Sequence, residues 1–400
     1  MANTFKFGNG NWAVKEDYAL AYNDENGNFK PLPFDFTRAS SATRVNKQGL
    51  IETVPSGKPR IDFLNNTKGH FLLEPSRTNL STNSEAFDSW TNGGTYVTAN
   101  QTVSPDGNTT ADQLSKTAAF QQIQNTATVV SGSDYSFSVF VKENTLDRIT
   151  LRLASGSNDV RKCLDLSDLS VVDAGGNQTG FVETKVEEYP NGWYKYTVVA
   201  TTGGTSLFMN IYAGQANVVE SGNIYIWGAQ LEAGSHETSY IPTSGSAVTR
   251  SAETSFQSTP TNAIGQTEGT LYLEVKPTNF DGDQRVSISD GSVTNRIALR
   301  LSGTTIQFSV VIGGTTQASI TGSGSAGNLY KIAGAYKEND FVIYINGTQA
   351  GVDTSGSISG TFNRIGLDRG TSANQFYNPI RDFRLYDTRL TNTELQNLTS

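Results

Sequence analysis

The chain of 400 residues is long enough for two to three domains at about 150 residues each. Its 30 Lys and Arg residues are outnumbered by 38 Asp and Glu residues. The net charge of −8 argues against binding to nucleic acid or to a membrane surface, because both require a basic face. Charged residues make up only 17% of the chain, which excludes a charge-driven disordered polymer.

The chain has few cysteines and histidines and lacks a long apolar segment. Cys163, His70 and His236 are too few for a zinc site built from four Cys or His ligands. No apolar run reaches 18 residues, and the first residues lack the apolar core of a secretory signal. We therefore expect a soluble protein, made in a reducing compartment, that does not insert into a membrane.

Alternating apolar and polar residues predict half-buried β-strands along the chain. The clearest alternations lie at residues 135–141, 149–153, 271–275, 297–301, 306–312 and 341–345. Turns rich in Asn and Gly separate the strands, as at Asn346-Gly347, because these residues adopt the positive φ angles of hairpin turns. One helix is predicted after Thr391, whose side chain is placed to form a capping box with Glu394.

These patterns predict an all-β fold with two β-sandwich (jelly-roll) domains and an irregular N-terminal segment. The predicted divisions are an attachment or oligomerisation segment at 1–78, a jelly roll at 79–250, a linker or outer strand at 251–267 and a second sandwich at 268–400. In the first segment, arginines are interleaved with acids, so we expect salt bridges in a packing region. These arginines are Arg38, Arg44, Arg60 and Arg77.

Several motifs in the first 250 residues occur in a fixed order. They include FTRASSAT at 36–43, LLEPSRTNL at 72–80, YSFSVFVK at 135–142, YIWGAQLE at 225–232 and SYIPT at 239–243. This block resembles bacteriophage tail-fibre and other virion appendage proteins over residues 34–250. The resemblance implies a virion protein, assembled in the host cytoplasm, that contacts other virion proteins and forms a homotrimer.

The two strand-rich modules carry further resemblances. The middle module is similar to carbohydrate-binding jelly-roll modules, in the phrase from Asn83 to Trp90 and in the later strands. The last module resembles the laminin-G-like, concanavalin A-like sandwich, with GTLYLEV at 269–275, FVIYING at 341–347 and IRDFRLYDTRL at 380–390. Modules of these kinds often bind glycans, and a host cell-surface glycan is the expected ligand.

A glycan site needs flat aromatic rings for stacking and amide or acidic side chains for the hydroxyl groups. Trp193 and Trp227 lie in apolar runs and are expected in the core. The remaining candidates lie beside turns or in loops. They are Trp90, Tyr96 and Tyr212 in the middle module and Asn374, Phe376 and Tyr377 in the last one.

Calcium is the ion that best suits loop carboxylates and carbonyl groups. The laminin-G-like resemblance implies an ion at the rim of the last module, and the candidate ligands there are Asp281, Asp283 and Asp368. Asp106 and Asn108 are candidates in the middle module. The alternative that all of these are ordinary turn residues stays open.

Catalysis has little support in the sequence. A glycosidase needs two carboxyl groups across a cleft, whereas the acidic pairs here, such as Asp165 with Asp168 and Asp281 with Asp283, lie at turns or strand ends. The predicted function is therefore non-enzymatic: a tail-fibre, appendage or head-fibre protein that binds host glycans for adsorption. Two alternatives are a capsid decoration protein without a ligand and a polysaccharide depolymerase.

Overall fold

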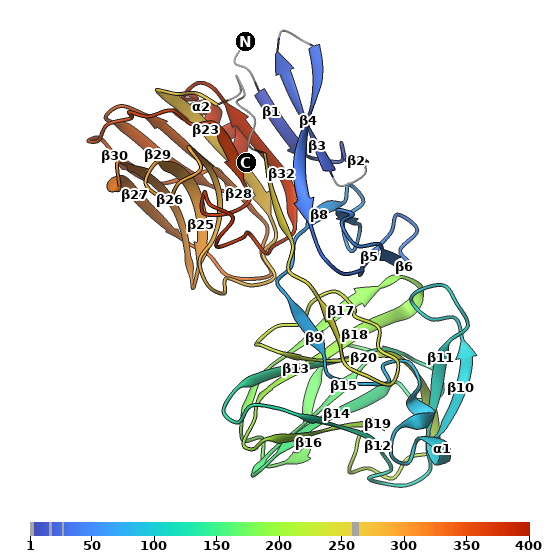
Figure 1. Cartoon of the computed structure of the whole chain (residues 1–400). Coiled ribbons are helices and arrows are strands. Elements are labelled where there is room, and N and C mark those ends of the chain that lie inside the picture. Colours follow the sequence, from blue (N-terminus) through green and yellow to red (C-terminus); the bar gives the residue numbers. More distant parts are fainter. Residues whose placement is uncertain (1–3, 16–17, 26–27, 258–263) are drawn as a thin grey trace. The chain divides into compact units, whose positions relative to one another are not determined.

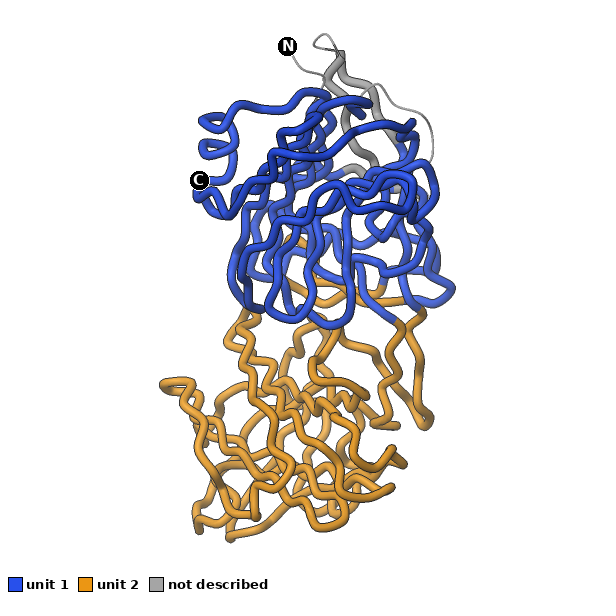
Figure 2. The backbone as a smooth tube through the Cα atoms, turned by 90° about the vertical axis from the view of Figure 1, so that its left-hand side faces the viewer, with its two compact units in different colours: residues 1–41, 54–75, 252–400 blue, residues 42–53, 76–251 orange. Residues whose placement is uncertain are grey.

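The computed structural model describes residues 4–15, 18–25, 28–257 and 264–400 and is almost entirely β-structure (Figure 1). The all-β prediction is therefore confirmed. The chain forms two compact units, coloured separately in Figure 2. Unit 1 comprises residues 1–41, 54–75 and 252–400, and unit 2 comprises 42–53 and 76–251.

The elements of unit 1 come from both ends of the chain. They are β1 (Thr4–Gly8), β2 (Ala13–Lys15), β3 (Tyr18–Glu25), β4 (Asn28–Thr37), β7 (Arg60–Asp62), β8 (His70–Leu72), β22 (Thr254–Gln257), β23 (Glu268–Val275), β24 (Gln284–Ser289), β25 (Arg296–Ser302), β26 (Thr305–Ile312), β27 (Thr315–Ser323), β28 (Tyr330–Lys337), β29 (Asp340–Ile345), β30 (Thr348–Asp353), β31 (Arg364–Gly366), β32 (Ile380–Tyr386) and α2 (Asn392–Thr399).

The strands of unit 1 form one continuous antiparallel sheet that folds into two layers. The first layer runs β30–β29–β28–β23–β32. The second runs β22–β31–β24–β25–β26–β27. The strands β1, β3 and β4 connect them, since β1 pairs with β32 and β4 pairs with β22.

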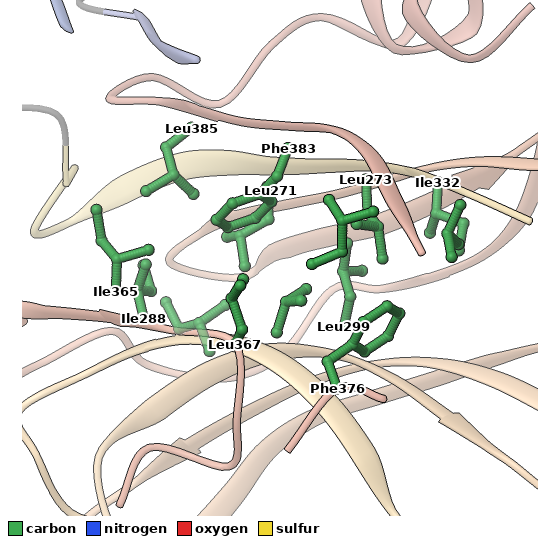
Figure 3. Close-up of a cluster of buried hydrophobic side chains, with 14 of the residues drawn as sticks. Leu271, Leu273, Ile288, Leu299, Ile332, Ile365, Leu367, Phe376, Phe383 and Leu385 are labelled. Carbon is green, nitrogen blue, oxygen red and sulfur yellow. The ribbon is translucent and has the colours of Figure 1, made fainter. Parts of the chain in front are cut away.

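Alternation along each strand directs one row of apolar side chains into the space between the layers. Leu271 and Leu273 of β23 and Phe383 of β32 face Ile288 of β24 and Leu299 of β25 (Figure 3). All five side chains are buried. Burial of apolar area on this scale is the main stabilising contribution to such a sandwich.

The N-terminal residues are not irregular, as the sequence predicted, but form strands; their predicted role in attachment or oligomerisation stays a prediction. β1 pairs with β32 over five residues, and Phe5 and Phe7 of β1 are buried in the core of unit 1. Segment 251–267 was predicted to be a linker or an outer strand, and residues 254–257 do form a strand, β22, which pairs on both sides, with β4 and with β31. Residues 258–263 lie outside the described residues. The prediction of an irregular N-terminal segment failed because alternation shows which face of a strand is apolar but not which strand it pairs with.

Four charged side chains are buried together in unit 1. Glu253 accepts hydrogen bonds from Arg38 at 2.7 Å and from Arg60 at 2.8 and 2.5 Å. Arg60 also binds Glu74 at 2.7 Å. The two carboxylates raise the pKa of Arg60, although burial opposes them. The predicted salt bridges of Arg38 and Arg60 are confirmed.

The remaining two predicted arginines lie in unit 2. Arg44 pairs with Glu52 at 2.7 Å, so its predicted salt bridge is also confirmed. Arg77 instead donates to the neighbouring carbonyl of Ser76.

Unit 2 is a jelly-roll sandwich of a six-stranded and a five-stranded sheet. Their strand orders are β10–β11–β20–β13–β18–β17 and β12–β19–β14–β15–β16. Its elements are β5 (Ala42–Val45), β6 (Ile51–Val54), β9 (Arg77–Asn79), η1 (Phe87–Ser89), α1 (Gly93–Tyr96), β10 (Val97–Thr102), β11 (Ala111–Lys116), β12 (Ile123–Thr128), β13 (Asp134–Lys142), β14 (Arg148–Ser155), β15 (Asn158–Asp165), β16 (Val171–Gly176), β17 (Phe181–Tyr189), η2 (Pro190–Gly192), β18 (Trp193–Thr201), β19 (Ser206–Ala213), β20 (Gly222–Ala233) and β21 (Val248–Arg250).

Two local predictions are also confirmed. Trp193 and Trp227 are buried, and their indole N–H groups donate to the Val103 carbonyl and the Thr110 hydroxyl. The helix α2 begins after Thr391 with the predicted capping box to Glu394. Within the described residues, no helix is long and apolar enough to cross a membrane.

Candidate functional site

The outer surface of the five-stranded sheet in unit 2 carries the strongest candidate site (Figure 1). In β19, Leu207, Met209 and Ile211 point into the core. Because side chains alternate along a strand, Phe208 and Asn210 point outward. The same alternation places polar side chains of β12, β14 and β15 on this surface.

Phe208 presents an aromatic ring to solvent. The residue is 40% exposed, and its cross-strand neighbours are the small residues Thr126 of β12 and Ala154 of β14. Small neighbours leave the ring face accessible. Such a ring suits stacking against the apolar CH face of a sugar.

A row of polar side chains crosses the sheet beside this ring, two residues further along β19. Gln124, Asn210, Arg152 and Arg161 are successive cross-strand partners on β12, β19, β14 and β15. Asn210 donates to the Gln124 side-chain oxygen at 3.0 Å and accepts from Arg152 at 3.2 Å. We refer to Phe208, Gln124, Asn210, Arg152, Asp159 and Arg161 together as the Phe208 face.

The two arginines of the Phe208 face share one carboxylate. Both Asp159 oxygens accept from Arg152, at 2.7 and 3.1 Å, and from Arg161, at 3.1 and 2.8 Å. Burial raises the pKa of Asp159, but the hydrogen bonds and charges of the two arginines outweigh it and lower the pKa to about 2. The carboxylate is therefore ionised at neutral pH and fixes both guanidinium groups.

Tyr212, a predicted glycan residue, lies on the same strand and the same outer face. Its ring is only 2% exposed and packs with Cys163, Ala174 and Ala216. Burial raises the pKa of its phenol, while the positive charge of Arg152 opposes that shift. The prediction of an accessible ring at Tyr212 is wrong.

The other aromatic candidates of unit 2 are also poor stacking platforms. Trp90 is buried against Phe87, with ring centroids 5.1 Å apart, and its indole N–H donates to the Asn83 carbonyl. Its predicted exposure is therefore wrong. Tyr96 is half-buried and packs against the core of the unit.

The three candidates of the last module share the loop between β31 and β32 in unit 1. Phe376 is fully buried in the core, so its ring is not accessible for stacking on a sugar (Figure 3). Tyr377 is half-buried and packs against that core. Asn374 is exposed, with a left-handed backbone at φ 54°. The loop thus presents an amide to solvent but not an open aromatic ring.

The residues predicted to bind calcium do not fit that ion. Asp283 pairs with Arg285 and Arg300, and Asp368 pairs with Arg364. These guanidinium groups occupy the carboxylate oxygens that calcium would need. Asp281 is exposed, and the described residues contain no group of three acidic, His or Cys side chains placed to hold a metal.

Asp106 of unit 2 has the contacts of a turn residue. It accepts from the Ser104 hydroxyl and from the backbone and side chain of Asn108. These local hydrogen bonds agree with the alternative that it shapes a loop.

The acidic groups of unit 2 also have structural contacts. Burial raises the pKa of Asp112 to about 6, and its oxygens accept the backbone N–H groups of Phe87 and Asn100. Asp165 pairs with Arg148 at 2.8 Å, and Asp168 accepts the N–H of Ser170. These contacts stabilise loops and strand ends. They differ from the arrangement in a glycosidase, in which two carboxyl groups face a bound sugar.

Comparison with known proteins identifies one domain. The Laminin_G_3 model, described as the concanavalin A-like lectin/glucanases superfamily, matches residues 250–396. The chain therefore contains a laminin-G-like, concanavalin A-like domain at the C-terminal end, as predicted. The match covers less than half of the chain. A search of curated proteins gave no match.

The solved structures that resemble this chain do so weakly. The CBM40 of Ruminococcus gnavus IT-sialidase is 15% identical over 34% of this chain and 84% of its own, with a TM-score of 0.30. Domains LG4-5 of the mouse laminin alpha1 chain are 11% identical over 68% and 88%, with a TM-score of 0.26. The SAP-like pentraxin of Limulus polyphemus is 12% identical over 36% and 81%, also at 0.26.

Sequence reasoning missed most of the Phe208 face. The segment around Phe208 reads LFMNIY, in which nearly every residue is apolar, so alternation does not show which side chains point outward. Arg152 and Asp159 lie in a predicted strand and its hairpin partner. Only the pairing of β14 with β15 brings them together.

Proposed function

We propose that the protein is a non-catalytic component of a bacteriophage particle that binds host surface glycans through the Phe208 face. The observation that carries the proposal is the exposed Phe208 ring beside a polar row of amide, guanidinium and carboxylate groups. A pyranose stacks its CH face on such a ring and directs its hydroxyl groups to the neighbouring polar atoms.

Two further observations support the proposal. The C-terminal domain matches a family described as concanavalin A-like lectins and glucanases. The ordered motifs of residues 34–250 resemble tail-fibre and virion appendage proteins. That resemblance supports a position on the particle, contacts with other virion proteins and a trimer, in which weak single-site binding gains strength from several copies.

The binding test is a glycan array followed by calorimetry on the purified full chain. We expect specific hits for the wild type and their loss in Phe208→Ala. The control is Phe181→Ala, which removes a ring of matched exposure, 38%, on β17 of the other sheet. Equal binding by Phe208→Ala and the wild type would contradict the proposed site. Absence of any glycan hit would favour a decoration protein without a ligand.

Two more measurements address the remaining parts of the proposal. Release of reducing sugar from host capsule would establish a depolymerase and overturn the non-catalytic role. Electron microscopy of phage particles labelled against this chain tests the virion position, and light scattering of the purified chain tests the trimer.

A further inference from the structure

The hydrogen-bond acceptors in the polar row of the Phe208 face are already occupied. Each Asp159 oxygen accepts one hydrogen bond from Arg152 and one from Arg161. A carboxylate accepts about four hydrogen bonds in total, so Asp159 has no capacity left for a ligand. The side-chain oxygens of Asn210 and Gln124 accept from Arg152 and from Asn210, respectively.

The same row retains N–H donors that no acceptor in the described part of the chain uses. Arg161 donates to Asp159 through Nε and Nη2, which leaves its Nη1 group available. Gln124 takes part through its side-chain oxygen, which leaves its NH₂ group available. The row therefore offers a ligand donors but few acceptors.

A sugar on the Phe208 ring can reach these donors. The side chains of Arg152 and Arg161 are 21% and 18% exposed, and Gln124 is also partly exposed. Two residues of a strand span about 7 Å, which is close to the width of a pyranose ring. Because the row lies two residues from Phe208 along β19, the substituents of a stacked sugar extend over it.

A surface of this kind favours ligand groups that only accept hydrogen bonds. A sugar hydroxyl also has an O–H that needs an acceptor, and an O–H covered without one is destabilising. A carbonyl oxygen accepts and donates nothing, so it fits the available groups of Arg161 and Gln124. An acetamido group supplies such a carbonyl, and its N–H can donate to the hydroxyl of Thr126, an exposed cross-strand neighbour of Phe208.

A carboxylate on the sugar also supplies acceptor oxygens, but the charge of Asp159 opposes it. Burial raises the pKa of Asp159, yet the hydrogen bonds and charges of its two arginines lower it to about 2. Asp159 is therefore ionised at neutral pH and repels a second carboxylate placed over the same row. A neutral carbonyl meets the same donors without this repulsion.

We infer that the Phe208 face binds acetamido sugars in preference to sugars whose substituents are hydroxyl groups alone. Phe208 stacks on the CH face of the sugar, while Arg161 and Gln124 donate to the acetyl carbonyl. This inference rests on the glycan-binding role proposed above for the same face and adds the chemical class of the sugar.

The test is calorimetry of the full chain with three trisaccharides: triacetylchitotriose, cellotriose and trigalacturonate. The first two differ only at C2 of each sugar, where an acetamido group replaces a hydroxyl group. We expect triacetylchitotriose to bind about 10-fold more tightly than cellotriose, as hydrogen bonds to a carbonyl are gained. Equal affinity for these two would overturn the inference, and so would tighter binding of trigalacturonate than of triacetylchitotriose.

Variants assign the preference to the polar row. Gln124→Glu replaces the NH₂ donor by an acceptor of the same shape and keeps the oxygen that accepts from Asn210. Gln124→Glu and Arg161→Gln should each lower the ratio of the two affinities about 5-fold, whereas Phe208→Ala should weaken both trisaccharides alike. The matched control is Gln113→Glu, at a partly exposed position of β11 in the other sheet, which should leave the ratio unchanged. Thermal melts confirm folding of each variant.

The results separate this inference from the proposed function. If the wild type binds both trisaccharides equally and Phe208→Ala weakens both, the glycan-binding role holds and the acetamido preference is wrong. Array hits that depend on Phe208 but are confined to sugars without an acetamido group lead to the same conclusion. Absence of binding in both experiments overturns the glycan-binding role as well.

Discussion

The outer sheet faces of the two units follow the same rule of alternation but present different chemistry. The Phe208 face of unit 2 has an exposed ring, and its carboxylate, Asp159, engages both of its arginines. The outer face of β24 and β25 in unit 1 carries arginines and small residues that are buried, because the loop after β31 accepts hydrogen bonds from Ser287 and Ser289. The face of unit 2 thus leaves a ring open to a ligand, whereas a loop of unit 1 covers the corresponding small residues there.

The largest expected effect on stability comes from the buried charges of unit 1. We compare it with the effect of breaking an exposed ion pair of unit 2. Glu253→Gln in unit 1 leaves the buried Arg38 and Arg60 without their shared carboxylate. We expect a loss of about 3–5 kcal/mol in the free energy of unfolding, because unpaired buried charges are costly. Chemical denaturation measures the change.

The matched control is an exposed ion pair of unit 2. Glu52→Gln breaks the pair of Glu52 with Arg44, whose side chains are partly exposed, and should cost at most about 1 kcal/mol. If both variants lose a similar amount of free energy of unfolding, burial does not make the ion pairs of Glu253 more stabilising than an exposed pair.

A pH titration tests the effect of a buried histidine of unit 1, His70, on stability. Burial, with the positive charge of Arg381, lowers the pKa of His70 to about 3, although an Asp62 oxygen lies 3.5 Å away. The folded state holds His70 neutral while the unfolded chain takes up a proton near pH 6.5. Its stabilising contribution is therefore complete above pH 6.5 and is lost as the pH falls toward 3.

Within that window, the free energy of unfolding should fall by about 1.4 kcal/mol for each pH unit. His70→Gln should remove this part of the slope, which is read as the difference between the two unfolding curves. Parallel curves between pH 6 and 4 would mean that His70 is already protonated in the folded protein.

The next effect concerns ligand binding by unit 2. Phe208→Ala should weaken glycan binding by about 1–2 kcal/mol, since it removes the stacking ring and the area that a sugar covers. The free energy of unfolding should change by less than about 0.5 kcal/mol, because the ring is largely exposed. A large loss of stability would instead assign the ring a packing role.

Local pattern was enough to predict much of the fold but little of the site. Strands such as β14 and β25 and the capped helix α2 follow from alternation and from Thr391 with Glu394. The pairing of β1 with β32 joins residues nearly 380 positions apart, and no local signal specifies it.

The site predictions failed for a related reason. Trp90 precedes an Asn-Gly-Gly turn and so resembles a loop platform, yet its ring packs on Phe87. Tyr212 lies on the correct strand face, but Cys163 and Ala216 pack against it. Exposure depends on which distant segments cover a side chain, and residue type and spacing do not specify those segments.

The last prediction concerns the paired charges of the Phe208 face. Asp159→Asn removes the carboxylate that Arg152 and Arg161 share. Because the pair is partly exposed, the free energy of unfolding should fall by no more than about 1 kcal/mol. The variant should gain affinity for polygalacturonate, since two guanidinium groups of unit 2 lose their anion. If the affinity stays at the wild-type value, the pairing of these two arginines with Asp159 does not determine which ligands the Phe208 face accepts.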